Sequence, residues 1–450
     1  MLCVPSAIRP IVSRFSVAFT RPTFQRFILL LIGFILAPRQ RTVTGALRVL
    51  GAAAVGHFSS FHRVLSHRVW RPLPLGKILA AIVLEMVPRD QPVVIPVDDT
   101  ATQHKGDHVW GKGLHRDACR STKSFQVWLW GHRWLVLAVS IRLPCCLARP
   151  WALPVLCAFY RPKELDEQEK RRRHKTPIDL ARQLVALLIR WFPERKFVLV
   201  ADGAFACHEL ANWCWRRRQH VTLVSRFRGD ANLYAPPPKA TKRKNRGGRP
   251  RVKGRKLASP ARVVERSKGK RFTVGWYGGG TRKVSLIWGE GGWYRGNIGL
   301  TPVRWVHVHD RSGTHRDEYF FSTDAAMQPQ EIVRLYTERW GIEVTFQEAK
   351  QKLGLGTPRN RCKQSVLRTV PCLMGCFTIV SLMFAQADKG KKVRSWPWYC
   401  RKEPTFGDAL TSARRLCWAE VFETSRKHRG SSKLPEPLRE ILLDQLSLAA

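Results

Sequence analysis

Acidic residues are scarce in this chain of 450 residues. It holds 33 Asp and Glu against 78 Lys and Arg, and the first acidic residue is Glu85. The formal net charge of +45 far exceeds what solubility needs and makes nucleic acid the expected partner. A basic protein that binds membranes usually carries a local basic cluster beside a hydrophobic segment. Here the positive charge runs through the whole sequence, so we expect no membrane partner.

Long apolar runs are also missing. The longest, Phe27 to Ala37, is interrupted only by Gly33 and is shorter than the roughly 20 residues that span a bilayer. It predicts a buried helix. A secretory signal is not expected, because Pro38 to Arg41 follows the run where small residues should stand. The Arg-rich, acid-free start can mimic an organelle transit peptide, but the same stretch has the rhythm of a helix-turn-helix.

Paired cysteine motifs are absent as well. The 12 cysteines contain no CxxC pair and no spacing to histidine of the zinc-binding kind. They indicate reduced, mostly buried thiols, which predicts a cytoplasmic protein.

Residues 1–88 are basic and predict a helical N-terminal DNA-binding region. Two helices are expected, Thr44 to Val55 and Phe58 to Arg68, around Gly56. As a helix-turn-helix they would direct residues such as His62 and Arg63 toward a DNA groove. A short helical hairpin without that role has the same pattern.

Residues 89–229 change to an α/β pattern, the first part of a catalytic core. Gly131 and His132 are interpreted as a hairpin turn between two strands. Thr176 is the expected N-cap of a helix that begins with a proline. The strands are expected at Val93 to Val97, Phe125 to Trp130, Trp134 to Ile141, Lys196 to Ala201 and Val221 to Phe227, with helices from Thr176 to Trp191 and from Cys207 to Arg218. The β-β-β-α-β-α-β order favours one mixed sheet with flanking helices.

Residues 230–322 differ in composition and predict a basic linker followed by a β-rich insertion. Gly247 to Arg251 resembles an AT-hook, although a plain basic linker is the stronger interpretation. The β-rich part carries four tryptophans, and for each of them a place in the β core is the stronger interpretation: Trp276, Trp288, Trp293 and Trp305. His307 and His309 share a strand face but have no evident third metal ligand. Residues 323–388 would complete the core, and 389–450 form a C-terminal helical region.

The most informative pattern is Y-x2-R-x3-E-x6-K, formed by Tyr336, Arg339, Glu343 and Lys350. At 100° per helical residue, with Arg339 at zero, Lys350 falls at about 20°, Glu343 at about 40° and Tyr336 at about 60°. One narrow stripe of a helix would carry all four. Without further support the stripe is a solvated face held by an Arg339–Glu343 pair, worth a few tenths of a kcal/mol.

Two aspartates favour a functional interpretation of the stripe over a solvated helix face. Asp98 and Asp202 each end an apolar strand, where a carboxylate can project from the sheet edge. With Glu343 they would supply three oxygen ligands for Mg²⁺ or Mn²⁺. Two such ions could drive an in-line phosphodiester displacement.

The cationic and phenolic members of the stripe suggest DNA contacts. Arg339 and Lys350 are placed to bind phosphates, and Tyr336 could donate a hydrogen bond to one. Strand geometry alone does not choose between Asp98 and Asp99 as the first acid.

These motifs resemble the DDE transposases of bacterial insertion sequences, in the cut-and-paste branch marked by the Y-x2-R-x3-E-x6-K motif. The resemblance covers about residues 90 to 360 and rests on Asp98-Asp99-Thr100, on Val200-Ala201-Asp202-Gly203 and on the stripe. The family's first acid stands in Asp-x-Thr, which favours Asp98.

The resemblance implies a ribonuclease H-like core interrupted by the β-rich insertion. It also implies Mg²⁺-dependent cleavage and strand transfer at terminal inverted repeats of double-stranded DNA, in a homodimeric synaptic complex associated with the nucleoid. The alternative is a catalytically inactive descendant that binds DNA as a repressor or architectural factor.

Overall fold

The computed structural model describes residue 5 and residues 8–38, 41–117, 120–122, 124–168, 173–238, 251–387, 403–429 and 435–448. The AT-hook-like segment lies, apart from Arg251, outside these described residues.

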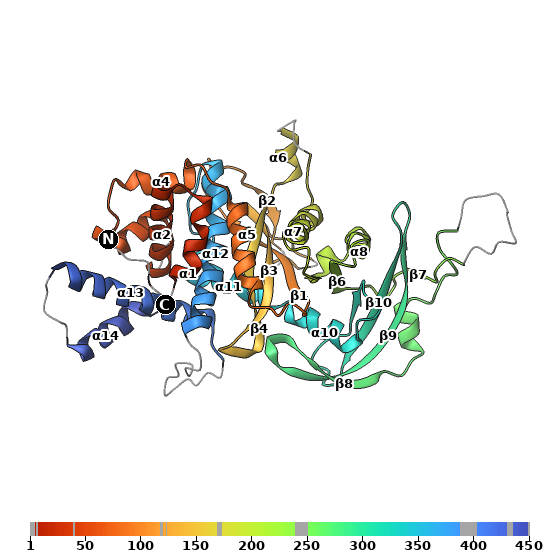
Figure 1. Ribbon diagram of the computed structural model, residues 1–450. Helices are drawn as coiled ribbons and strands as arrows, with labels where there is room; N and C mark the ends of the chain where they lie inside the picture. The colour runs from red at the N-terminus through yellow and green to blue at the C-terminus, as the bar shows by residue number, and fades with distance from the viewer. Residues whose placement is uncertain are drawn as a thin grey trace.

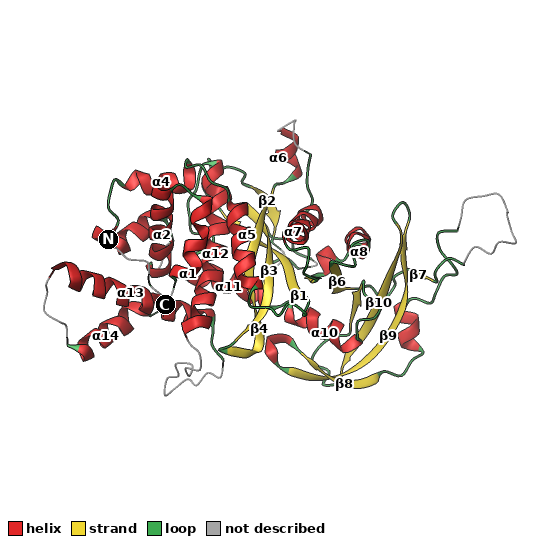
Figure 2. Cartoon of the chain, in the orientation of Figure 1, coloured by secondary structure: helices red, strands yellow, loops and turns green. Residues whose placement is uncertain are grey.

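The described part of the chain is a mixed α/β fold built on one 11-stranded sheet (Figure 2). The strand order is β2-β3-β1-β5-β6-β11-β10-β9-β7, with β4 also paired to β3 and β8 to β9. The strands are β1 (Val93–Gln103), β2 (Gly113–Arg116), β3 (Trp128–Leu143), β4 (Cys146–Tyr160), β5 (Phe197–Ala201), β6 (Val221–Arg226), β7 (Leu233–Tyr234), β8 (Lys270–Gly275), β9 (Thr281–Arg295), β10 (Gly299–Asp310) and β11 (Glu318–Ser322).

Helices cover both faces of this sheet, and a helical region lies beyond one of its ends (Figure 1). The N-terminal helices are α1 (Arg9–Ser13), α2 (Arg21–Leu36), α3 (Val43–Leu50), α4 (Phe58–Ser66) and α5 (Pro72–Leu84). The central helices are α6 (Lys163–Gln168), α7 (Pro177–Trp191), α8 (His208–Trp215), α9 (Pro260–Glu265), α10 (Pro329–Glu338) and α11 (Gly341–Lys352). The C-terminal helices are α12 (Lys363–Ala387), α13 (Phe406–Arg429) and α14 (Glu436–Ser447). Helices α5, α11 and α12 pack on β4, while α7 packs on β3 and β4.

The three central strands run parallel, as their apolar sequences favour. β1 pairs with β5 from Val93↔Phe197 to Val97↔Ala201, and β5 pairs with β6. Every residue of β5 is buried. Parallel strands buried on both faces read as continuous apolar runs, which is why the sequence located β5 and β6 closely.

The expected Gly131–His132 hairpin turn is wrong. Both residues lie inside the long strand β3, which pairs with β1 and forms its hairpin with β4 instead. A Cβ on Gly131 would lie 1.9 Å from the Thr102 carbonyl oxygen. The glycine therefore permits a close approach of two backbones, the other common use of glycine in a strand.

The strands of the expected insertion do not form a separate sheet. β11 pairs antiparallel with β6 from Phe320↔Arg226 to Ser322↔Val224, and β10 pairs with β11. The β-rich composition is as expected, but the strands extend the central sheet. Among the four tryptophans, Trp276 and Trp305 are buried, whereas Trp288 and Trp293 are partly buried.

Local helix signals were accurate where a cap defines them. Thr176 accepts a hydrogen bond from the Asp179 backbone N–H, and the Asp179 carboxylate accepts one from the Thr176 backbone N–H, which completes a capping box. In the N-terminal region α3 begins one residue earlier than expected, at Val43, because Thr42 caps it. The long apolar run lies in α2, whose residues from Leu30 to Leu36 are buried.

One helix among the described residues is long and apolar enough to cross a membrane. It is the segment Lys363–Gln386 of α12, and 78% of its most apolar window is buried against the rest of the chain. Buried core helices share that length and composition. Cys376 on this helix is fully buried, and burial raises its pKa to about 12, so the thiol stays protonated.

Two buried arginines join the helical regions. Arg368 of α12 donates four hydrogen bonds to the carbonyls of Val64, Leu65, Arg68 and Trp70 and stacks over the Trp70 ring. Arg414 of α13 donates to the carbonyls of Ile35 and Ala37 at the end of α2. The last carbonyls of a helix have no N–H donor from a following turn. Each guanidinium supplies such donors at the end of α4 or α2 and so fixes the position of that helix end.

We predict that Arg368→Met lowers the free energy of unfolding by about 3 kcal/mol or more, because it leaves several buried carbonyls without a donor. Urea denaturation followed by circular dichroism would measure the change. Arg228→Met is the matched control, since the Arg228 side chain is mostly exposed and its guanidinium bonds to the neighbouring Asp230. Equal stability losses in the two variants would contradict the capping role.

Candidate active site

Asp98 and Asp202 emerge side by side from neighbouring parallel strands. The β1–β5 pairing ends at Val97↔Ala201, and each aspartate is the next residue after its paired strand residue. Asp98 was expected at a strand end, but β1 continues to Gln103 because it pairs onward with β3. The parallel register brings the two carboxylates to the same edge.

Asp202 is held by its own local turn and by a neighbouring strand. Its carboxylate accepts a hydrogen bond from the Ala204 backbone N–H at 3.0 Å. The buried Ser225 hydroxyl, on β6, lies 2.9 Å from the carbonyl oxygens of both Ala201 and Asp202. The backbone that carries the carboxylate is therefore fixed from two sides.

The helix that carries the stripe is broken between Tyr336 and Glu343. α10 ends at Glu338 and α11 begins at Gly341, and backbone bonds such as Ile342 N–H to Arg339 carbonyl span three residues instead of four. Such a stretch is a tightened 3₁₀-type turn. The expected single continuous helix is wrong, because this joint interrupts it.

Arg339 lies at this joint and connects the helices to the sheet. Its Nη1 donates to Asp98 Oδ2 at 2.8 Å, and its Nη2 donates to Glu343 Oε1 at 2.6 Å. Its side chain is only 8% exposed. Burial disfavours the charge, yet the carboxylates of Asp98 and Glu343 outweigh that effect and raise the pKa of Arg339 overall. Arg339 therefore stays cationic and compensates two acids.

The two aspartates are poor anions in this setting. Burial raises the pKa of Asp98 to about 7, Arg339 opposes that shift, and the charges of Asp202 and Asp99 add to it. Burial also raises the pKa of Asp202, again against the influence of Arg339. A further cation beside them would favour both ionised forms.

Asp98 and Asp99 have different partners. Asp99 accepts a two-pronged pair of hydrogen bonds from Arg133 on β3, at 2.6 and 2.7 Å. Asp98 instead contacts Arg339 and lies next to Asp202. Alternation along β1 therefore points the two carboxylates to opposite faces of the sheet, where they meet different partners.

The remaining members of the stripe do not share one surface. Tyr336 is 3% exposed, its ring stacks on Phe320 with centroids 4.2 Å apart, and the Arg339 guanidinium lies 5.5 Å from its centroid. Lys350 is exposed on α11. Tyr336 therefore supports Arg339 from the core, while Lys350 is open to solvent.

The donor set suits a hard cation, but the acids are not gathered around one point. Carboxylate oxygens are preferred ligands of Mg²⁺ and Mn²⁺. In the described part of the chain, however, no group of three His, Cys, Asp or Glu side chains is arranged to hold a metal ion. Asp98 and Asp202 fit such an ion, while Glu343 is bonded to Arg339 and 44% exposed.

Several site residues were missed by sequence reasoning. Ser225, Arg133 and Arg226 all lie on strands beside the aspartates, and Arg226 pairs with Glu318 of β11. A polar pair at the end of the apolar β6 is the signal that could have located Ser225 and Arg226. Arg133 was hidden because its strand was interpreted as a turn.

The histidine pair of β10 has a partner that the sequence did not reveal. His307 Nε2 and His309 Nδ1 lie 3.1 and 2.8 Å from the two oxygens of Asp317. The two rings and the carboxylate form a local hydrogen-bonded group remote in sequence from the aspartates.

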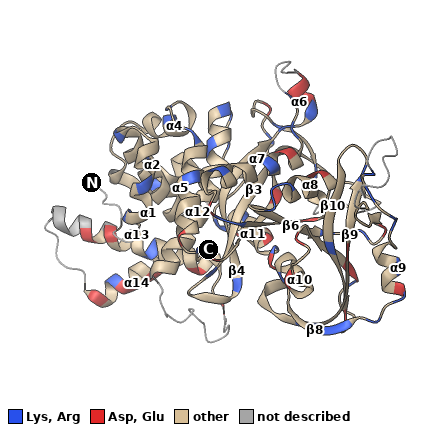
Figure 3. Ribbon diagram, turned by 45° about the vertical axis from the view of Figure 1, so that its right-hand side comes forward, with Lys and Arg blue, Asp and Glu red and all other residues tan. Residues whose placement is uncertain are grey.

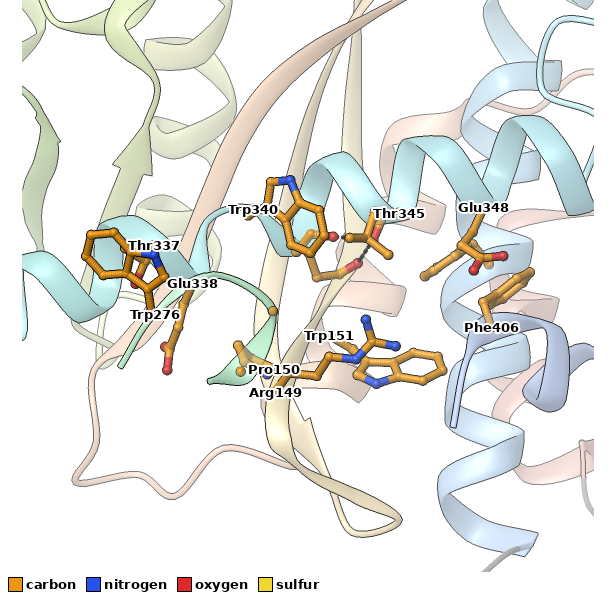
Figure 4. A pocket seen from close by; sticks show the side chains of 16 residues that line it. Arg149, Pro150, Trp151, Trp276, Thr337, Glu338, Trp340, Thr345, Glu348 and Phe406 are labelled. Carbon is orange, nitrogen blue, oxygen red and sulfur yellow. Dashed lines mark hydrogen bonds between the residues drawn. The ribbon is translucent and has the colours of Figure 1, made fainter. Parts of the chain in front are cut away.

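A hollow lies beside the joint, and Thr345 and Glu348 of α11 border it (Figure 4). Trp276, Trp340 and Glu338 line it together with Arg149, and Glu338 also pairs with Arg142 and Arg334. Of the insertion tryptophans, Trp276 is the one that borders this space. Glu338 is thereby engaged away from Asp98.

Two buried histidines, one on β2 and one on β3, resist protonation. Burial lowers the pKa of His115 and of His132 to about 4, and His132 Nε2 bonds to the Trp110 carbonyl at 2.9 Å. The unfolded side chains take up a proton near pH 6.5, whereas the folded ones do so near pH 4.

We therefore expect folding stability to be fully present above about pH 6.5 and to fall as the pH drops toward 4. The loss should be on the order of 1–3 kcal/mol for His132. Urea denaturation at about pH 7 and pH 5 would measure it, and His132→Gln should flatten the dependence. An unchanged pH slope in that variant would contradict the assignment.

A second prediction concerns Arg339. Arg339→Met should lower the free energy of unfolding by roughly 3 kcal/mol, because it leaves the buried Asp98 carboxyl without its cation. The double variant Asp98→Asn/Arg339→Met should recover at least about 1 kcal/mol relative to the sum of the single variants. Arg334→Met is the control, since Arg334 also pairs with two acids but is more exposed. Strict additivity would show that the pair carries no coupling.

Comparisons with known proteins come from structure and from sequence. A cryo-EM structure of a piggyBac transposase synaptic complex with hairpin DNA aligns over 98% of this chain and 84% of that one, with 14% identity and a TM-score of 0.42. That similarity is too low to carry an argument. No curated protein matches the chain.

The match to a family model is direct. The model described as DDE superfamily endonuclease matches residues 14–283, which is more than half of the chain and includes Asp98 and Asp202 but not Glu343. On this match, the chain belongs to the DDE superfamily of endonucleases.

Proposed function

We propose that this protein is a transposase that cuts and rejoins DNA at the terminal inverted repeats of an insertion sequence. The observation that carries the proposal is that Arg339 bonds to both Asp98 and Glu343, with Asp202 next to Asp98 on the neighbouring parallel strand, in a chain of the DDE endonuclease superfamily. The Y-x2-R-x3-E-x6-K motif supports assignment to the cut-and-paste branch.

The proposed core is ribonuclease H-like. Its support is the order β1, β3, β4, α7, β5, α8, β6, in which β1, β5 and β6 are parallel and β3 is antiparallel to β1. Residues 89–229 and 323–388 would form this core, and the strands of 230–322 would extend its sheet. Residues 1–88 and 389–450 would be the flanking helical regions.

In this proposal Asp98, Asp202 and Glu343 hold two Mg²⁺ or Mn²⁺ ions. Such ions, when bound, would activate the attacking hydroxyl and stabilise the leaving oxygen. Asp98 and Asp202 stand on the rigid parallel strands, and Ser225 fixes the Asp202 backbone. Glu343 would join them from α11, and its support is that Arg339 bonds to both Glu343 and Asp98.

The other stripe residues take different roles. The exposed Lys350 would contact a phosphate on the DNA, about two helical turns from Glu343 along the same face of α11. Arg339 would balance the charge of the acids and contact phosphate as they rearrange, and Tyr336 would hold Arg339 in place from the core. Arg133 would keep Asp99 directed away from the reaction.

DNA is the proposed partner, bound as transposon ends and as target by a homodimer in the nucleoid. The charge of +45 supports this, and Figure 3 shows Lys and Arg distributed over the helical region and the sheet alike. Affinity should then depend steeply on salt, because each phosphate contact releases counterions.

A DNA-binding protein without catalysis is the second candidate, and one observation favours it. Arg339 already compensates Asp98 and Glu343, and the acids within the described residues do not form a ready metal group. Such a protein would bind the element's ends and leave them intact with Mg²⁺ or Mn²⁺.

Cleavage of a supercoiled plasmid carrying the DNA that flanks the gene would separate the two. We expect excision with Mg²⁺ that falls roughly 10³-fold or more in Asp98→Asn and in Asp202→Asn. Asp99→Asn is the matched control and should retain most of the activity, because Asp99 is bonded to Arg133. The cut ends would be measured on sequencing gels.

Two outcomes would change the conclusion. Loss of cleavage in Asp99→Asn with activity retained in Asp98→Asn would move the first acid by one residue. Tight end binding with no cleavage by the unaltered protein in either metal would favour the inactive alternative.

A further inference from the structure

The region beyond the catalytic edge carries an exposed aromatic surface. Five Phe and Trp side chains are exposed among the described residues, and three of them, Phe125, Trp128 and Trp130, lie together at the start of β3. Trp128 and Trp130 are each 54% exposed. We call β2 together with Trp128 to Gly131 of β3 the aromatic arm; its strand β2 is labelled in Figure 1.

Strand register places the exposed groups on one face of this arm. Leu114 is directly opposite Trp130, and Arg116 is directly opposite Trp128. Because side chains alternate along a strand, these four residues point to the same side. The opposite face carries His115, which is buried and lies against the Tyr160 ring. The arm is therefore packed on one face and open on the other.

Cations accompany the aromatic rings. The Lys112 ammonium lies 5.6 Å from the centre of the Trp130 ring, and the exposed Arg116 stands across from Trp128. Lys105 is also exposed in the preceding loop. Of the nearby acids, Asp107 is almost fully open to solvent and lies 3.9 Å from the Lys112 ammonium, which also donates to the Gly106 carbonyl. Asp117 bonds to the Arg120 backbone and pairs with its side chain. The open face thus combines flat apolar rings with positive charge, which complements a polyanion that has exposed bases.

Spacing along the strand fits stacked bases. Residues two apart on an antiparallel strand are separated by about 6.8 Å, so Trp128 and Trp130 stand at about twice the 3.4 Å rise of a nucleic acid strand. One base can occupy the interval between their side chains. A duplex shields its base faces, so this surface favours an unpaired strand.

The strand register also gives the distance between the arm and Asp98. Asp98 is opposite Val136 on β3, and Trp130 is six residues from Val136 along the same strand. At about 3.4 Å per residue, Trp130 is roughly 20 Å from the catalytic edge. Asp98 of β1 and Trp130 of β3 lie on directly paired strands, so their separation is fixed.

We propose that the aromatic arm binds an unpaired DNA strand by stacking bases on Trp128 and Trp130, with Lys112 and Arg116 contacting its phosphates. The inference rests on the proposed function only in taking DNA as the polymer. It assigns to the chain a second DNA-binding surface, separate from Asp98, Asp202 and Glu343, that holds single-stranded DNA near the cleavage edge.

The test is binding of the full-length protein to fluorescently labelled oligo(dT), measured by anisotropy, beside a duplex with the same number of phosphates. Trp128→Ala/Trp130→Ala should weaken oligo(dT) binding by about tenfold or more and leave duplex binding within about twofold. Trp128→Phe/Trp130→Phe should restore most of the affinity, because phenyl rings also stack. Tryptophan fluorescence of the unaltered protein should be quenched by oligo(dT).

Val69→Ala/Leu147→Ala is the matched control, since it removes two other strongly exposed apolar side chains and should bind as the unaltered protein does. Equal losses for oligo(dT) and duplex, or no loss for either, would overturn the proposal. So would a change from dimer to monomer in the Trp128→Ala/Trp130→Ala protein by light scattering, which would assign the face to a second copy of the chain.

Asp98→Asn separates this inference from the proposed function. That variant should lose cleavage and still bind oligo(dT) with unaltered affinity. If the tryptophan variant binds normally while Asp98→Asn abolishes cleavage, the arm proposal alone fails. If Asp98→Asn still cleaves, the catalytic assignment fails whatever the arm does.

Discussion

The buried guanidinium of Arg339 is the interaction on which the site depends. It lies at the joint between α10 and α11 and bonds to Asp98 of β1 and to Glu343 of α11. Without a cation there, Asp98 would carry its charge in a buried environment in which it already resists ionisation. Phe320 and Tyr336 fill the core below it. One side chain thus sets the position of the helix relative to the sheet and the charge state of the acids.

The elements that could be predicted from sequence are those with local causes. The capping box at Thr176 defines the start of α7, and the unbroken apolar run of β5 identifies a strand buried on both faces. Gly131 shows where such reasoning stops. A glycine in a strand pattern marks either a turn or a close backbone approach, and only the pairing of β3 with β1 decides which. The joint at Arg339 is likewise invisible to a helical wheel, which assumes one continuous helix.

The site was predictable to the extent that register determines it. Asp98 and Asp202 follow two apolar strands, and parallel pairing carries both to one edge. Asp98 and Asp99 have different partners because Arg133, which the sequence placed next to a turn, bonds to Asp99. Tyr336 was expected on an open stripe, but its ring belongs to the core that α10 shares with β11. Contacts between residues far apart in sequence decided each of these points.

The pairing of β11 with β6 has a consequence for how the chain folds during synthesis. β6 ends at Arg226 and its partner strand begins at Glu318, so one edge of the growing sheet has no partner until about 90 further residues are made. At 5–20 residues per second this interval lasts roughly 5–20 s. An open strand edge is a template for association with other chains. The nascent protein therefore passes through a period in which the edge of β6, at the centre of the finished sheet, is open to other chains.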